Sequence, residues 1–373
     1  MDALMLPLNW QRVRLGDIGK PCMCKRVMKH QTTRYGEIPF YKIGTFGNTA
    51  DAFISKKLFL EYKTKYSFPK KGDILISASG TIGRAVIYDG KPAYFQDSNI
   101  VWIDNDETLV KNDFLFYAYS NIKWNTEHTT ILRLYNDNFK NTLIPLPPLN
   151  EQIAIANILS ALDRYLCTLD DLILKKEGVK KALSFELLSQ RKRLKGFNQA
   201  WQRVRLGDIA NYLTSNLSAE QITQQGKIKV YDVNNFIGYT DTTFISDKPY
   251  ISIVKDGSVG RVRILPPKTN ILSTMGALIA NHKTTTEFLF YLLSNFDFKN
   301  FTSGSIIPHI YFKDYKEKTI FLPPLNEQSA IADILSDLDN EIASLKNKKR
   351  QFENIKKALN HDLMSAKIRV LKK

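Results

Sequence analysis

Two copies of one sequence pattern occupy this chain, and the repeat limits its fold more than any other feature. The nonapeptide WQRVRLGDI occurs at residues 10–18 and again, letter for letter, at residues 201–209. The heptapeptide LPPLNEQ occurs at residues 146–152 and again at residues 322–328. These markers recur at spacings of 191 and 176 residues, so the first copy carries about 15 extra residues between them. The sequence therefore predicts a tandem duplication of one domain plan.

Shorter markers agree between these borders, while the rest of each copy differs strongly. A shared frame with divergent contents is expected where each copy recognises a different target. The shorter pairs are SGTIGR (79–84) with DGSVGR (256–261), FLFYAYSN (114–121) with FLFYLLSN (288–295), and TILRLY (130–135) with IIPHIY (306–311).

A long helix is expected after each LPPL marker. Asn150 and Asn326 suit the N-cap position, and each is followed by a glutamate that places negative charge at the positive end of the helix dipole. Apolar residues then recur at spacings of four and three, which is typical of a coiled-coil seam. The register predicts a first helix over 150–195, roughly 65–70 Å long at ~1.5 Å per residue, with Gly196 as its stop. The seam residues are Ile155, Leu159, Leu162, Leu166 and Leu169 in the first helix and Ile331, Leu335, Leu338, Ile342 and Leu345 in the second.

The charges on both helices predict how they pair. Residues 150–174 carry a net charge of −3 and residues 175–195 carry +6, while residues 326–345 carry −5 and residues 346–373 carry +8. Antiparallel pairing sets acid against base at both ends, whereas parallel pairing sets base against base. We therefore expect an antiparallel coiled coil with a pseudo-twofold axis. Exposed ion pairs contribute little stability, so the charges select orientation above all.

These patterns predict a mixed α/β fold with two similar globular domains, at 1–149 and 197–325, separated by spacer helices at 150–196 and 326–373. Short strands, one helix and many turns are expected in each domain. The expected strands are 38–43, 73–77, 84–88, 99–103, 250–254 and 261–265, and the expected helices are 113–122 and 287–294.

A Gly-x-x-Gly-Arg turn appears in both copies, at 80–84 and 257–261. Its glycines are expected to form a hairpin turn, which needs positive φ. This role is favoured over direct contact with a phosphate. For the arginine of each turn, exposure to solvent and contact with a phosphate are weighted equally. Tyr135 and Tyr311 follow matching positions and are interpreted as core residues. The candidate DNA-contact residues are Ser79, Thr81, Arg84, Arg133, Lys255, Ser258, Arg261 and His309.

Composition narrows the class of function. The net charge of +16 permits a polyanionic partner. The sequence has no Walker loop, dinucleotide fingerprint or amino-methyltransferase motif. No catalytic arrangement repeats across both copies, and the three cysteines do not supply a zinc site. These observations favour binding over catalysis. The N-terminus lacks the features of a signal peptide, and no apolar run reaches the ~18 residues of a membrane span. We therefore expect the protein to be located in the reducing environment of the cytoplasm.

The ordered set of markers resembles the specificity subunits of Type I restriction-modification systems, over nearly the whole chain. The W-x-x-x-x-L-G-D-I start of each half, GDILISASGTIGRAVIYDG (72–90) and the two LPPLNEQ helix starts carry this resemblance. In the second half, ISIVKDGSVGRV and SGSIIPHIYFKDY resemble another subtype of the same domain.

The resemblance implies that each globular domain is a target-recognition domain that reads one half of a bipartite site in double-stranded DNA. The helices would set the gap between the half-sites and dock two methylation subunits, which use S-adenosylmethionine. Two restriction subunits that use ATP and magnesium would join where DNA is cut. The chain itself would bind no cofactor or metal and would not be an enzyme.

Other functions stay open on sequence alone. The chain could serve a fused methylase-nuclease system, which uses the same kind of reading domain in another assembly. It could instead be a protein-binding coiled-coil adaptor, which predicts no DNA binding. A catalytic DNA enzyme is disfavoured, because no catalytic constellation is repeated.

Overall fold

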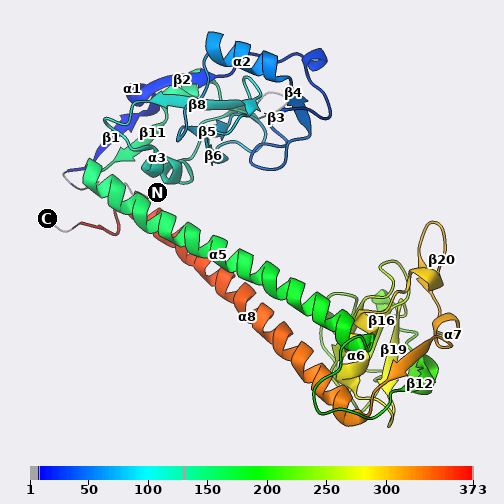
Figure 1. Ribbon diagram of the computed structural model, residues 1–373. Coiled ribbons are helices and arrows are strands. Elements are labelled where there is room, and N and C mark those ends of the chain that lie inside the picture. Colours follow the sequence, from blue (N-terminus) through cyan, green and yellow to red (C-terminus); the bar gives the residue numbers. More distant parts are fainter. Residues whose placement is uncertain (1–6, 8, 129–131, 372–373) are drawn as a thin grey trace. The chain divides into compact units, whose positions relative to one another are not determined.

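The structure, a computed structural model, describes residue 7, residues 9–128 and residues 132–371 (Figure 1). Met1–Leu6, for which no signal peptide is expected, and Thr130–Ile131 of one marker lie outside the described residues. The chain divides into two compact units. Unit 1 comprises residues 1–169 and 348–373, and unit 2 comprises residues 170–347. In the described part of the chain, no helix has the length and apolar character needed to cross a membrane.

The two long sequence markers form the border of each unit. In unit 1, β1 (Gln11–Arg14) pairs antiparallel with β11 (Leu143–Leu146). In unit 2, β12 (Gln202–Arg205) pairs antiparallel with β22 (Thr319–Leu322). WQRVR thus supplies one strand of the ladder that closes each unit, and LPPL begins at the last residue of the other strand, so the two markers meet at one border.

A four-stranded antiparallel sheet forms the centre of each unit, in the order β2-β8-β5-β6 in unit 1 and β13-β19-β16-β17 in unit 2. Successive side chains of a strand point to opposite faces. Ile74 and Ile76 therefore face one core, whereas Leu75 faces another. Because both faces are covered, the inner strands β5 and β16 are buried along their whole length instead of alternating. The strands are β2 (Gly19–Met23), β8 (Ile100–Asn105), β5 (Ile74–Ser77), β6 (Ala85–Ile87), β13 (Ala210–Thr214), β19 (Met275–Ala280), β16 (Tyr250–Val254) and β17 (Val262–Leu265). The six strands and two helices expected from sequence are confirmed, and no end is shifted by more than three residues.

A smaller three-stranded sheet covers one face of the central sheet. Its order is β4-β3-β7 in unit 1 and β15-β14-β18 in unit 2. Unit 1 also has helix α2 (Lys56–Lys65) between β4 and β5, and unit 2 has no counterpart in its described residues. The spacing between the copies falls from 191 to 177 residues across this segment, so α2 accounts for most of the extra residues of the first copy. The strands are β3 (Ile38–Tyr41), β4 (Ala52–Ile54), β7 (Tyr94–Phe95), β14 (Ile228–Tyr231), β15 (Phe236–Thr240) and β18 (Asn270–Ile271).

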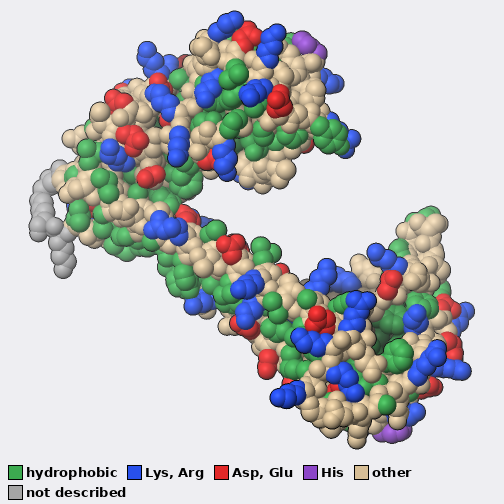
Figure 2. Space-filling model, viewed as in Figure 1, with side chains coloured by type: hydrophobic (Ala, Val, Ile, Leu, Met, Phe, Trp, Pro, Cys, Tyr) green, Lys and Arg blue, Asp and Glu red, His purple; other side chains and the backbone are tan. Residues whose placement is uncertain are grey.

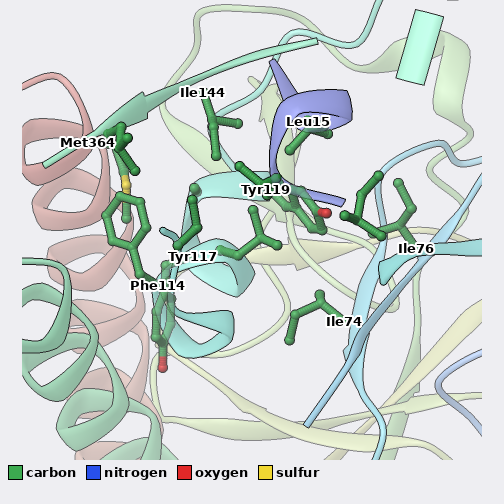
Figure 3. Packing of buried hydrophobic residues seen from close by; sticks show 14 of the residues in the cluster. Leu15, Ile74, Ile76, Phe114, Tyr117, Tyr119, Ile144 and Met364 are labelled. Carbon is green, nitrogen blue, oxygen red and sulfur yellow. The ribbon is translucent and has the colours of Figure 1, made fainter. Parts of the chain in front are cut away.

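Helix α3 (Asn112–Tyr119) covers the other face in unit 1, and α6 (Thr286–Ser294) does so in unit 2. Figure 3 shows Phe114 and Tyr119 of α3 among the apolar side chains of this core, with Met364 from the C-terminal helix. The FLFYAY part of this marker therefore lies in the helix and fills the core through its aromatic residues. The remaining short elements are α1 (Leu15–Ile18), η1 (Lys29–Gln31), β9 (Glu127–His128), β10 (Leu132–Arg133), α4 (Asn136–Asn141), η2 (Leu206–Asp208), η3 (Ala219–Gln221), η4 (Lys299–Phe301), β20 (Thr302–Ser303), β21 (His309–Ile310) and α7 (Phe312–Tyr315).

The long helices α5 (Leu149–Leu188) and α8 (Leu325–Met364) each contribute to both units. In unit 1, the beginning of α5 lies against the end of α8, where Lys356 forms an ion pair with Asp163. In unit 2, the end of α5 lies against the beginning of α8, where Lys180 Nζ is 2.5 Å from Asp339 Oδ1. The antiparallel pairing of acid with base is therefore confirmed in each unit.

A tyrosine of the adjacent core also binds each of these aspartates. The Tyr117 hydroxyl donates to Asp163 Oδ2 at 2.7 Å, and the Tyr291 hydroxyl donates to Asp339 Oδ2 at 3.0 Å. Burial, together with this hydrogen bond, raises the pKa of both tyrosines, so the phenols remain protonated donors. The same aspartate thus joins the two long helices to the globular part of each unit.

The expected ends of the helices were wrong. Because α5 begins at Leu149, Asn150 lies in the first turn and is not the N-cap, although its Oδ1 accepts from the Glu151 N–H at 2.9 Å. Asn326 behaves in the same way in α8. The first helix ends at Leu188, not at 195, because Gln190 adopts a φ of +60° that a right-handed helix cannot continue. Gly196 is therefore not the stop.

The expected seam has a different role at its ends and in its middle. Ile155 and Leu159 are fully buried in the core of unit 1, where they pack with α3. Ile331 and Leu335 are buried in the same way in unit 2. The start of each long helix therefore packs into the core of its own unit and does not serve the helix pair alone. Leu169 and Ile342 are also buried, whereas Leu162, Leu166, Leu338 and Leu345 are half-buried.

Candidate nucleic-acid interface

The Gly-x-x-Gly turns have the backbone geometry that the sequence predicts. The φ angles are +66° at Gly80 and +84° at Gly83, and +83° at Gly257 and +80° at Gly260. A side chain at Gly83 would lie 2.1 Å from Trp124 Nε1, whereas nothing surrounds Gly80 within 4 Å. The first glycine of the turn therefore lies open to solvent, and the second is packed against the core.

In each unit this turn meets a short strand from a distant part of the sequence. Ser79 forms an isolated β-bridge with Arg133 in unit 1, and Asp256 forms the matching bridge with His309 in unit 2. The structure thus brings the candidate residues of each copy to one corner, as their matching sequence positions suggest.

The candidates of unit 1 are not equally available to a ligand. Arg133 and Thr81 are exposed. Arg84 is also exposed, and its guanidinium reaches the Gly47 carbonyl only at 3.4 Å. Ser79 is buried, and its hydroxyl donates to Asn99 Oδ1 at 2.8 Å. The prediction that Ser79 contacts DNA is therefore not supported, because its hydroxyl is already used inside the unit.

A basic groove lies beside this corner of unit 1, with a volume of about 480 Å³. Four cationic side chains line it: Arg133 together with Arg26, Lys29 and Lys42. Arg26 Nε is 2.8 Å from Asp97 Oδ2, which fixes its guanidinium at the edge of the groove. Such a groove suits the phosphate oxygens of a nucleic acid. Sequence analysis missed the last three residues, because they lie between the repeated markers.

The candidates of unit 2 carry different chemistry. Ser258 and Arg261 are exposed, and Lys255 is half-buried. His309 Nδ1 lies 2.6 Å from Asp256 Oδ1, so the imidazole is held by a carboxylate. A hollow in unit 2, about 360 Å³, is lined by uncharged side chains that include Thr214, Ser215, Asn216, Thr242 and Thr243.

Two tyrosines and one hairpin tip were missed as surface features. Tyr135 and Tyr311, expected in the core, are 41% and 50% exposed. Ile306, between β20 and β21, is 93% exposed. Figure 2 shows Lys and Arg side chains spread over the surface of both units with acidic side chains among them. The local groove, and not the net charge, therefore distinguishes the corner of unit 1.

No group of three or more His, Cys, Asp or Glu side chains that could hold a metal ion occurs among the residues that the structure describes. Cys22, Cys24 and Cys167 are free thiols. Burial raises the pKa of Cys24 to about 12, so this thiol is a poor nucleophile.

Comparison with known proteins gives the family. The profile of the type I restriction modification DNA specificity domain matches residues 7–176 and again residues 198–354. The chain belongs to this family. The two matches coincide with the two sequence copies, so the duplicated plan is a duplicated specificity domain.

Two relatives illustrate this membership. A protein of Haemophilus influenzae, named as a type I restriction enzyme specificity subunit, is 64% identical over 148 residues. This match spans 39% of the present chain and only 38% of that protein. The MjaVIII specificity subunit of Methanocaldococcus jannaschii is 26% identical over an alignment that covers 99% of this chain and 95% of its own length.

Solved structures share the fold. The S subunit of a type I restriction-modification system from M. genitalium superposes with a TM-score of 0.63 at 21% identity, covering 96% of this chain and 98% of its own. A chain from a structural study of complex assembly in a type I system gives 0.57 at 16% identity, with the same coverage.

Proposed function

We propose that this chain is the DNA-reading subunit of a type I restriction-modification complex, and that each unit reads one half of a bipartite site. One observation carries the proposal: both units hold different side chains at the same corner of the same frame. The basic groove of unit 1 supplies contacts to the DNA backbone, and the exposed arginines of both turns add to them. Arg84, Arg133, Arg261 and His309 remain proposed contacts, together with Thr81, Ser258 and Lys255.

In this proposal, partner subunits carry out the methylation and cleavage of DNA. Two methylation subunits use S-adenosylmethionine to methylate adenine, and restriction subunits use ATP and magnesium to cut. The family relatives carry type I names, which favours separate subunits over a fused methylase-nuclease. The assembly acts where cellular DNA is accessible, which agrees with the cytoplasmic location expected from sequence.

The docking surface for the methylation subunits needs residues other than the buried seam. Exposed apolar side chains lie on α5, among them Leu174 at 66% and Phe185 at 53% exposure. Substitution Leu174→Asp should reduce co-purification of a methylation subunit, whereas Lys181→Asp, at an exposed polar position of the same helix, should not. Equal co-purification of both variants would contradict this assignment.

The central experiment co-expresses the chain with its neighbouring methyltransferase gene and maps methylated adenines across a genome. We expect one bipartite sequence that disappears when this chain is omitted. Replacing residues 10–145 with a homologous domain should change one half of that sequence and leave the other. A change in both halves, or in neither, would show that the units do not read independently.

A further inference from the structure

A shared backbone frame positions three side chains in each unit. In unit 1, the Ala78 N–H donates to the Asn99 carbonyl at 2.7 Å, and the Leu134 N–H donates to the Ala78 carbonyl at 2.9 Å. The Gly80 N–H also donates to the Leu132 carbonyl at 3.2 Å. These bonds tie the Gly-x-x-Gly turn to the residue before β8 and to β10.

Unit 2 repeats this frame bond for bond. The Lys255 N–H donates to the Thr274 carbonyl at 3.1 Å, and the Ile310 N–H donates to the Lys255 carbonyl at 2.9 Å. The Gly257 N–H donates to the Pro308 carbonyl at 2.9 Å. Because the backbone is the same, differences between the corners lie in the side chains.

The side chains on this frame differ at all three positions. Unit 1 has Ser79, Asn99 and Arg133, and unit 2 has Asp256, Thr274 and His309. The first position binds a different partner in each unit, because Ser79 holds Asn99 whereas Asp256 holds His309. In both units, one polar side chain is thus fixed by another, which is the arrangement that accurate base reading requires.

We propose that these three positions form a reading triad, which determines the bases recognised in each half-site. The triads are Ser79–Asn99–Arg133 and Asp256–Thr274–His309. This inference rests on the proposed function and adds the specificity-determining residues to it. Asn99 and Arg133 both line the basic groove, so a duplex bound there through its phosphates brings base edges to them.

The chemistry of the unit 1 triad suits purines. Asn99 Oδ1 accepts from Ser79 through one lone pair, which leaves the second lone pair and the two Nδ2 hydrogens for a ligand. A carboxamide in this state can bind adenine at N6 and N7, and an arginine fork such as that of Arg133 can bind guanine at O6 and N7. Ser79 is a positioning residue, since it touches Asn99 and not the DNA.

The unit 2 triad presents different groups. With Nδ1–H donated to Asp256, a neutral His309 offers Nε2 as an acceptor, which suits the amino group of cytosine or adenine. Thr274 offers one hydroxyl where unit 1 has a carboxamide. The two triads therefore read different bases from the same frame.

The test uses the complete complex of this chain with its methylation subunits, and a pool of randomised duplexes from which bound sequences are selected. The variants Asn99→Asp and Arg133→Lys preserve size, and Asn99→Asp retains the acceptor for Ser79. Each should reduce discrimination at one base of the unit 1 half-site about ten- to a hundredfold, with the unit 2 half-site unchanged. Ser79→Ala should weaken discrimination at the Asn99 base, and Ser79→Thr should restore it.

The second part of the experiment transplants the triad of unit 1 into unit 2. The triple variant Asp256→Ser, Thr274→Asn, His309→Arg should alter bases in the unit 2 half-site alone, so the unchanged unit 1 half-site reports an intact complex. Variants that select the wild-type bases with undiminished discrimination would overturn the triad while the proposed function stands. A uniform loss of affinity at every base would do the same, because it indicates phosphate contact alone. A wild-type complex that selects no bipartite sequence would overturn both proposals.

Discussion

The indole of Trp10 donates from Nε1 to Glu151 Oε2 at 3.0 Å, which joins the first residue of one repeated marker to the glutamate of the other across 141 positions. Arg369 completes the site, with its Nε 2.7 Å from Glu151 Oε1. Unit 2 repeats the arrangement, because Trp201 Nε1 lies 3.0 Å from Glu327 Oε2 and Arg193 binds the same carboxylate. The buried glutamate thus links the first strand, the helix start and the segment after the partner helix.

Replacing Glu151 with Gln should destabilise unit 1. The amide can still accept from Trp10 but leaves Arg369 without its charged partner, which should cost about 2 kcal/mol. Denaturant unfolding combined with hydrogen exchange measures the loss, which should be confined to unit 1. Glu327→Gln is the matched control and should weaken unit 2 instead. An unchanged stability in both variants would mean that the charge of the glutamate contributes nothing.

The two glycines of the first turn should tolerate alanine very differently. Gly80→Ala adds only the strain of a positive φ, about 1–2 kcal/mol, since nothing lies within 4 Å of the new Cβ. Gly83→Ala adds the same strain and places Cβ 2.1 Å from Trp124 Nε1, so the total loss should reach about 3 kcal/mol or more. Thermal unfolding of both variants tests the difference. Equal losses would show that Trp124 moves aside freely.

The markers of the sequence predicted the frame but not its bonds. The repeat showed that Trp10 and Glu151 belong to fixed borders, yet periodicity within one segment cannot reveal a partner so far away. The end of α5 was misplaced because residues 189–195 are mostly polar and basic, with no proline or glycine before Gly196. The left-handed φ at Gln190 follows from the local packing, not from a residue type that favours it.

Candidate residues could be named from the sequence only where the two copies could be aligned. Arg133 and His309 were found because they stand at matching places, and the structure does bring each to its turn. Arg26 and Lys42 lie in the divergent interior, where one copy gives no information about the other. The burial of Ser79 could not be predicted, because its partner Asn99 is placed beside it only by the fold.

The helix pair offers a test by exchange of charges. Lys356→Glu sets a carboxylate against Asp163 and should cost about 1 kcal/mol, a small value because both side chains are partly exposed. Adding Asp163→Lys should recover part of the loss, although Tyr117 then lacks its acceptor. Unfolding at low and high salt measures the effect, which salt should diminish. No loss at low salt would contradict a contribution of this pair to the orientation of the helices.

The tip of the β20–β21 hairpin should bind DNA without stabilising the fold. Ile306 leaves 93% of its surface in water, so Ile306→Ser should change the free energy of unfolding by less than about 0.5 kcal/mol. The loop from Gly304 leads into the strand of His309, so Ile306 precedes this residue of the proposed unit 2 triad by three positions. Isoleucine there can contact a thymine methyl group or enter between base pairs.

The Ile306→Ser variant should therefore weaken binding to the cognate duplex several-fold, as measured by titration of the complex. Phe321→Ser, at a 52% exposed position of the border strand β22, is the control and should leave binding unchanged. If Ile306→Ser binds as tightly as the wild type, the tip contributes nothing to recognition.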